Sequence, residues 1–197
     1  MKKNRQLHLL PNTGLSYGGE LLKTRKGRSH GRPIDTKSTM HLVLRSSQAK
    51  GDLSFATPKN RKVIGDNVQK FSIKYGIKIL SLANVGNHIH LHIRISKRGG
   101  YKAFIRATTS AIRLGIAGSK RWNTEKIQGK FWDYRPFSRV IRGLRSFLTI
   151  KDYILINRAE GLGIPRSQVK YLIRSKKWSS DQLRIKVDQY EVWAGSG

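Results

Sequence analysis

The chain contains no cysteine, and only 11 of its 197 residues are acidic. The absence of cysteine excludes disulfide bonds, zinc-ribbon sites and a cysteine nucleophile. The few carboxylates face 40 Lys and Arg residues, which leaves a formal net charge of +29 at pH 7. Internal ion pairs cannot balance this excess, so the sequence predicts a polyanionic partner: DNA, RNA or an anionic membrane surface.

Long hydrophobic runs are also absent. No apolar segment approaches the ~20 residues that a membrane-spanning helix requires, so we expect no membrane partner. The hydrophobic fraction of 38% is nevertheless enough for a folded core. The length favours one domain with extensions, and we divide the chain into a basic N-terminal arm (1–39), a central domain (40–160) and a C-terminal extension (161–197).

The most informative motif is a segment with histidine at every second position. Alternate side chains of a β-strand share a face, so His88, His90 and His92 would lie together while the aliphatic residues between them enter the core. Two imidazoles side by side on a rigid strand form a favourable site for a divalent metal ion. The motif therefore predicts a metal site on a strongly basic protein.

The remaining patterns predict an alternation of strands and helices. The expected elements are a strand 40–45, a helix from Thr57-Pro58 to Gly76, strands 77–83 and 87–95, a helix from Gly99-Gly100, an extended segment 130–142, a helix 144–160 and a short helix 168–175. In the second of these helices we expect a core-facing stripe formed by Phe104, Ala107, Ala111 and Leu114.

This order predicts the fold class. It is an α+β fold with a ferredoxin-like βαββαβ antiparallel sheet, helices on one face, and an additional C-terminal helix. In that topology the first and third strands are neighbours. His41 and Arg45 would then lie beside the histidines on the open face of the sheet.

The helix 144–160 carries polar residues suited to catalysis. Leu144, Leu148 and Leu155 predict a hydrophobic stripe, with Tyr153 and Asn157 roughly opposite it. Residues four apart on a helix are neighbours. Tyrosine offers an oxygen nucleophile, and the asparagine carbonyl can bind a hard metal ion.

These motifs together resemble one protein family. The segment 87–90 is similar to the Asn-His-hydrophobic-His box of HUH endonucleases. The segment 153–159 resembles the tyrosine helix of single-tyrosine transposases, most closely the REP-associated group. Phe131-Trp132-Asp133 with Arg135, and Gly76 to Ile79, also fit that family over residues 40–160. Two positions depart from it: Arg158 replaces a proline, and His92 replaces an aliphatic residue.

The resemblance implies single-stranded DNA cleavage through a 5′-phosphotyrosine intermediate. Mapped onto this chain, Tyr153 is the nucleophile, and His88, His90 and Asn157 are ligands of Mg²⁺ or Mn²⁺. The expected substrate is single-stranded or hairpin-bearing DNA, and the expected location is the cytoplasm, at the nucleoid. A monomer and a homodimer both remain possible, because the tyrosine can serve its own histidines or those of a partner.

Other residues are predicted to contact DNA through charge or base stacking. They are Lys26, Arg28, Arg32, His41, Arg45, His92, Lys130, Trp132, Tyr134, Arg135, Arg139, Arg142 and Arg145. For four of these the sequence leaves a second role open: His41 and His92 could instead support a metal ligand, and Trp132 and Tyr134 could instead pack within the fold.

Two alternatives remain from the sequence. One is a non-catalytic basic RNA- or DNA-binding module of RRM-like fold, which would leave the paired histidines and the tyrosine helix unexplained. The other is a metal-dependent nuclease in which water attacks the phosphate.

Overall fold

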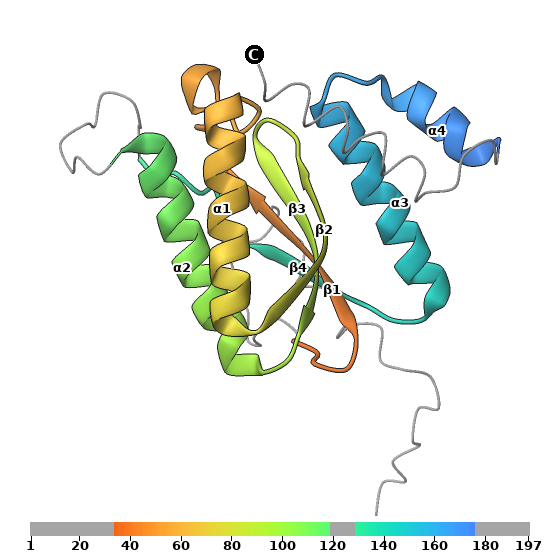
Figure 1. The fold of residues 1–197 in the computed structure, drawn as a ribbon, viewed down its shortest axis with the longest axis horizontal. Coiled ribbons are helices and arrows are strands. Elements are labelled where there is room, and N and C mark those ends of the chain that lie inside the picture. The colour runs from red at the N-terminus through yellow and green to blue at the C-terminus, as the bar shows by residue number, and fades with distance from the viewer. Residues whose placement is uncertain (1–33, 119–128, 176–197) are drawn as a thin grey trace, which may run out of the picture.

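The structure, a computed structural model, describes residues 34–118 and 129–175. Figure 1 shows one antiparallel sheet with α1 and α2 on one side and α3 and α4 on the other. The elements are β1 (Thr39–Arg45), the short 3-10 helix η2 (Gly51–Leu53), α1 (Pro58–Tyr75), β2 (Ile77–Asn84), β3 (His88–Ile95), α2 (Arg98–Ala117), β4 (Phe137–Ile141), α3 (Leu144–Gly161) and α4 (Arg166–Arg174).

The strand order is β2-β3-β1-β4, and every neighbouring pair is antiparallel. This arrangement confirms the ferredoxin-like βαββαβ prediction, including the pairing of the first strand with the third. In the register of β1 on β3, His41 lies opposite His92 and Arg45 lies opposite His88. The topology therefore gathers histidines from two strands on one face of the sheet.

The other face of the sheet forms the main core. Ile89, Leu91 and Ile93 of β3 are fully buried beneath α1 and α2, together with Met40 and Leu42 of β1. Burying an aliphatic side chain of this size contributes about 1.5–3 kcal/mol. The alternation predicted for the histidine strand is confirmed, because hydrophobic burial on one face leaves the imidazoles on the other.

Helix α1 begins and ends where its sequence predicts. The Thr57 hydroxyl accepts a hydrogen bond of 3.3 Å from the Asn60 backbone amide, and Pro58 occupies the first turn. Gly76 ends the helix in the left-handed conformation, with φ of 64°.

The predicted core stripe of α2 is wrong in part. The buried residues are Tyr101, Phe104, Thr108 and Ile112, whereas Leu114 is 44% exposed. The stripe that the structure buries contains Tyr101 and Ile112, and these side chains bury more apolar surface than Ala107 and Ala111 would. This difference determines which face of α2 turns toward the sheet.

The predicted faces of α3 are also wrong in part, since of the three leucines of the predicted stripe Leu155 is buried and the other two are not. Leu144 and Leu148 are 73% and 47% exposed, while Ile150, Ile154 and Leu155 are buried. The helix contacts two surfaces: Ile150 and Ile154 pack toward β2 and β4, and Leu155 packs against α4. One leucine stripe could not reveal two docking surfaces. Tyr153 consequently lies on the sheet side of α3 rather than opposite the hydrophobic contacts.

Of the segment expected to be extended, only Phe137–Ile141 forms a strand. The preceding residues form a loop, in which Phe131 is buried in the core beside Phe55. The short C-terminal helix begins at Arg166, two residues earlier than expected, and buries Val169. Within residues 34–118 and 129–175, none of the helices combines the length and hydrophobicity needed to cross a bilayer.

The end of α3 approaches the end of β2 so closely that only glycine fits. A Cβ atom on Gly161 would collide with the carbonyl oxygen of Asn84. Gly65, in the middle of α1, has open space at the equivalent point. We predict that Gly161→Ala lowers the free energy of unfolding by about 1–3 kcal/mol, whereas Gly65→Ala raises it by about 0.5–1 kcal/mol through helix propensity. Urea denaturation of both variants measures this; equal stabilities would contradict the close docking of α3.

Candidate active site

Three histidines from two strands meet near the middle of the sheet. The ring centroids of His88 and His90 lie 4.7 Å apart on β3. His41, on the neighbouring strand β1, stacks on His90 with ring centroids 5.2 Å apart and places its Nε2 atom 3.0 Å from Nδ1 of His90. His41 and His90 are buried, and His88 is half-buried.

Tyr153 of α3 packs against two of these histidines, His41 and His90. Its ring centroid is 5.3 Å from that of His90 and 5.8 Å from that of His41, in both cases edge to face. Tyr153 remains 36% exposed, so part of the residue is open to solvent. The tyrosine and the histidine pair of one chain therefore come together without a second copy.

Hydrogen bonds orient both imidazoles of the predicted ligand pair. Nδ1 of His88 lies 2.7 Å from the Asn87 side-chain oxygen, an acceptor, so Nδ1 carries the proton and Nε2 keeps its lone pair. His90 reaches the same state when its Nδ1–H donates to Nε2 of His41. The Nε2 atom of His90 is buried and has no hydrogen-bond partner among the described residues. An unpaired buried imidazole nitrogen is suited to a metal ion.

The surroundings keep these imidazoles neutral. Burial lowers the pKa of His41 and of His92 to about 4, and burial together with the neighbouring His41 lowers the pKa of His90 to about 3. Burial, followed by the charge of Arg45, also lowers the pKa of His88. All four rings are therefore in the form that can coordinate a metal at neutral pH.

Asn157, the predicted third donor, lies on the next turn of α3 after Tyr153. It is 4% exposed, and its side-chain nitrogen donates a 2.6 Å hydrogen bond to the carbonyl of Tyr153. This bond does not use the side-chain oxygen, which is the atom that a metal would bind. Within the described ranges, no three His, Cys, Asp or Glu side chains form a metal-binding group. A metal here would therefore rely on two imidazoles, the amide and oxygens from water or substrate.

His92 differs from the other histidines of its strand. Its Nε2 atom lies 2.8 Å from the Thr39 hydroxyl, and its ring packs against Phe147 at 4.9 Å between centroids. His41 and His92, both predicted to contact DNA, are only 6% and 1% exposed. Their side chains act within the protein in this structure, and a DNA contact for either stays a prediction.

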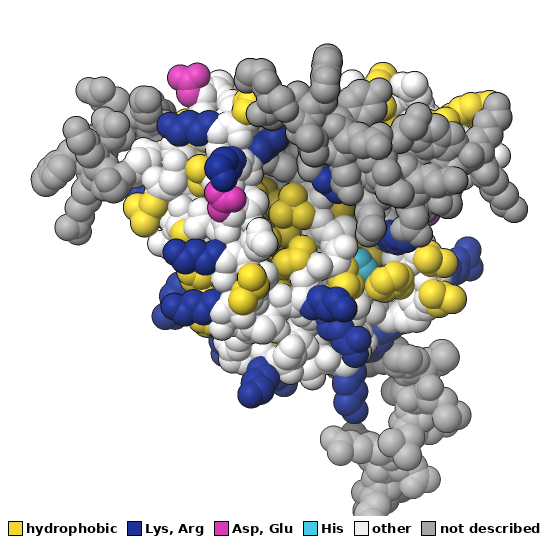
Figure 2. Space-filling model, in the orientation of Figure 1, with side chains coloured by type: hydrophobic (Ala, Val, Ile, Leu, Met, Phe, Trp, Pro, Cys, Tyr) yellow, Lys and Arg dark blue, Asp and Glu magenta, His cyan; other side chains and the backbone are white. Residues whose placement is uncertain are grey.

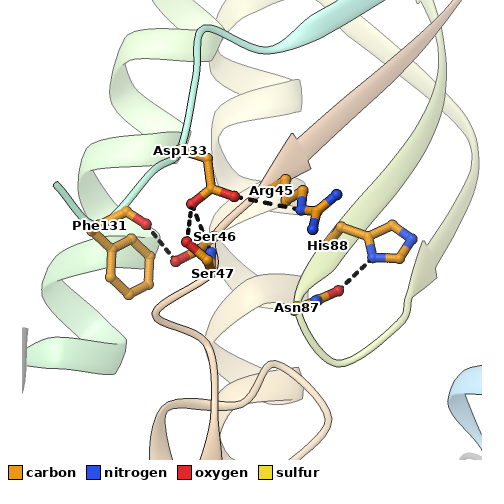
Figure 3. A network of polar contacts seen from close by, with 7 residues as sticks. All are labelled: Arg45, Ser46, Ser47, Asn87, His88, Phe131 and Asp133. Carbon is orange, nitrogen blue, oxygen red and sulfur yellow. Dashed lines mark hydrogen bonds and ion pairs between the residues drawn. The ribbon is translucent and has the colours of Figure 1, made fainter. Parts of the chain in front are cut away.

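A polar network fixes Arg45 beside the histidines (Figure 3). The guanidinium Nε lies 3.4 Å from Asp133 Oδ2. The other carboxylate oxygen accepts 2.7 Å hydrogen bonds from the backbone amide and the hydroxyl of Ser47. Asp133 also donates its backbone N–H to the Arg45 carbonyl over 3.1 Å. The carboxylate thus holds an exposed cation next to His88, a role that sequence patterns did not assign to Asp133.

The other predicted DNA-contacting residues fall into three groups. Lys130, Tyr134, Arg135, Arg142 and Arg145 are exposed, and Arg139 is half-buried opposite His41 in the register of β1 and β4. Trp132 is half-buried, donates a 3.0 Å hydrogen bond to the Thr109 carbonyl and packs on Phe55, so it serves the core. Lys26, Arg28 and Arg32 lie outside the described residues.

Figure 2 shows Lys and Arg side chains spread over the visible face with few acidic ones among them.

A cation near Tyr153 comes from α4. The guanidinium carbon of Arg166 lies 5.9 Å from the centroid of the Tyr153 ring, and one of its nitrogens lies 2.8 Å from Glu160. The sequence had no signal for this contact, because the approach of Arg166 depends on how α4 folds back on α3.

The solved structures include two with a likeness to this chain. One is a REP-associated tyrosine transposase bound to a REP hairpin, with a TM-score of 0.54 and 13% identity, over 68% of this chain and 74% of that one. The other, described as a candidate transposase from Deinococcus radiodurans R1, has a TM-score of 0.40 and 14% identity, over 66% of this chain and 95% of that one. The first likeness supports a shared fold, and the second is too weak to support an inference. No protein-family model and no curated sequence matches the chain.

The buried neutral histidines predict that acid destabilises the protein. An unfolded histidine has a pKa of about 6.5, whereas burial holds the folded-state pKa of His41 and His92 at about 4. The unfolded chain therefore binds more protons, and stability present above pH ~6.5 is lost as the pH falls toward the folded pKa values. The loss is roughly 1 kcal/mol per pH unit for each histidine.

Urea denaturation at successive pH values between 7 and 5 measures this loss. His92→Asn removes one titrating group, so the slope of stability against pH should become smaller. A slope that is flat in the parent protein would show that the histidines are not buried as described.

Proposed function

We propose that this protein cleaves and rejoins single-stranded DNA through a covalent bond between Tyr153 and the 5′-phosphate at the break. The observation that carries the proposal is the position of Tyr153, whose ring lies 5.3 Å from that of His90 and remains accessible to solvent. A structural tyrosine would not need neutral, unpaired imidazole nitrogens beneath it.

The donor set fits Mg²⁺ or Mn²⁺. The Nε2 atoms of His88 and His90 and the side-chain oxygen of Asn157 would hold the ion, with positions left for phosphate oxygens. When bound, such an ion stabilises negative charge on a phosphate. Asn87 accepts the Nδ1–H of His88, and His41 accepts the Nδ1–H of His90. These hydrogen bonds would leave the Nε2 atom of each proposed ligand free to bind the ion.

The reaction needs no external nucleophile. The Tyr153 oxygen attacks the phosphorus and loses its proton to solvent, the bond from phosphorus to the 3′ oxygen breaks, and that oxygen takes up a proton as the 3′-hydroxyl. The new phosphotyrosine keeps the energy of the broken phosphodiester, so the 3′-hydroxyl of another strand can reverse the step and join to the 5′ end.

The substrate that we propose is hairpin-bearing single-stranded DNA. Three observations support it: the net charge of +29, the sequence motifs, and the shared fold with a transposase whose structure contains a REP hairpin. A transposase or a domesticated relative, at work on the nucleoid in the cytoplasm, fits this substrate. The contact of Tyr153 with His90 of the same chain supports cleavage by a monomer, and a homodimer in which strands are exchanged is equally part of this proposal.

We predict a metal-dependent covalent adduct between Tyr153 and DNA. Labelled oligonucleotides with hairpins from the DNA flanking the gene are incubated with Mn²⁺ or Mg²⁺ and separated on a denaturing gel. Label should migrate with the protein, and Tyr153→Phe, His88→Ala and His90→Ala should each abolish the signal. Tyr171→Phe, which changes an exposed tyrosine of α4, is the matched control and should retain it.

The alternatives give different products. Cleavage without an adduct that survives Tyr153→Phe would identify water as the nucleophile. Binding without cleavage across all the hairpins would favour the non-catalytic nucleic-acid-binding module.

A second prediction concerns His41 and the metal. Gln at position 41 can still accept a hydrogen bond from Nδ1–H of His90, whereas Leu cannot. We expect His41→Leu to lower Mn²⁺ affinity about 10- to 100-fold, and His41→Gln to retain most of it. Calorimetric titration with Mn²⁺ measures both variants, with circular dichroism as the control for folding. Equal affinities would show that the contact with His90 does not orient a ligand.

A further inference from the structure

Helix α4 lies in the C-terminal extension, to which the sequence assigned no role. It packs on α3 through a small hydrophobic cluster centred on Leu155, Ala159 and Val169. Val169 is 1% exposed, so α4 is docked rather than loosely attached. Figure 1 shows α4 lying alongside α3. This docking brings the first residue of α4, Arg166, close to Tyr153 of α3.

Arg166 is placed between a ring and a carboxylate. Its guanidinium carbon lies 5.9 Å from the centre of the Tyr153 ring, and its Nη1 atom lies 2.8 Å from Glu160 Oε2. The guanidinium is also near enough to His90 to help lower the pKa of that histidine, after burial and the two neighbouring histidines. One cation thus lies close to both the proposed nucleophile and a proposed ligand.

Both partners of this ion pair are accessible. The side chains of Arg166 and Glu160 are 38% and 40% exposed, and Tyr153 is 36% exposed. An exposed ion pair contributes little to stability, so exchanging the Glu160 carboxylate for a phosphate costs little. Guanidinium is suited to this exchange, because it binds phosphate through two parallel N–H groups while it stacks on an aromatic ring.

We propose that Arg166 binds the phosphate that Tyr153 attacks, and that Glu160 holds Arg166 in place until DNA arrives. This inference rests on the proposed function. Arg166 would contact the phosphate from the side of α4, while the histidines lie beneath it on the sheet. The charge that develops on the phosphate oxygens would then meet the fixed Arg166 guanidinium on the side of α4. The C-terminal extension is thereby part of the active centre.

The test compares two arginines of the same helix. Arg166→Ala removes the proposed phosphate ligand, and Arg174→Ala removes an equal charge from the exposed last turn of α4. With the hairpin oligonucleotides and Mn²⁺, the rate of adduct formation should fall about 10- to 100-fold in Arg166→Ala and remain near the parent rate in Arg174→Ala. An unchanged rate in Arg166→Ala would overturn the inference.

Chemical rescue separates a phosphate ligand from a structural contact. Millimolar guanidinium chloride should restore part of the activity of Arg166→Ala, whereas potassium chloride at the same ionic strength should not. Glu160→Gln keeps a side-chain oxygen that can accept the hydrogen bond from Arg166, so it should retain more activity than Arg166→Ala. Failure of rescue, together with an equal loss in Glu160→Gln, would show that the pair only staples α4 to α3 and would overturn the inference.

The salt dependence of oligonucleotide binding tests the inference even if no adduct forms. In that case the proposed function fails, and binding of the same oligonucleotides is measured against salt concentration. A contact between Arg166 and one phosphate of a single strand should make the slope of log K against log salt smaller by about 0.7 in Arg166→Ala, with no change in Arg174→Ala. An unchanged slope in Arg166→Ala would overturn the contact itself.

Discussion

The alternation of side chains along β3 is the constraint on which the rest of the structure depends. Each residue of a strand faces opposite its neighbours, so the burial of Ile89, Leu91 and Ile93 under α1 and α2 forces His88, His90 and His92 onto the other face. A shift of one residue in register would put three imidazoles in the hydrophobic core. The core therefore fixes the position of the site, and the proposed chemistry rests on the same interaction that stabilises the fold.

Buried imidazole nitrogens without hydrogen-bond partners would lower the stability of the fold, because buried polar groups need partners. The structure provides them from outside β3: His41 for His90, Asn87 for His88, and Thr39 for His92. These contacts make each histidine different. His90 is left with an unpaired nitrogen and lies against Tyr153, and His92 is held against Phe147.

Helices α3 and α4 complete the site from above. Gly161 allows α3 to approach the end of β2, and the contact of Val169 with α3 positions α4. Through this docking Tyr153 contacts His41 and His90, and Arg166 contacts Tyr153. A tyrosine on a helix that is packed on two sides is held more precisely than one on a loop, and Tyr153 is still 36% exposed.

The sequence by itself determined the ferredoxin-like topology, the caps of α1, and the shared face of the three histidines, because these follow from local periodicity, turn residues and burial. It did not determine which face α3 buries, since that helix contacts the sheet and α4 at once, nor the stripe of α2, where larger side chains outweighed two alanines. The contacts that His41, Asp133 and Arg166 make were decided only by tertiary structure, although the predicted strand order already placed His41 beside the histidines. Each acts on a residue from a different element, here on His90, Arg45 and Tyr153 respectively, and such contacts arise from packing that no local pattern encodes.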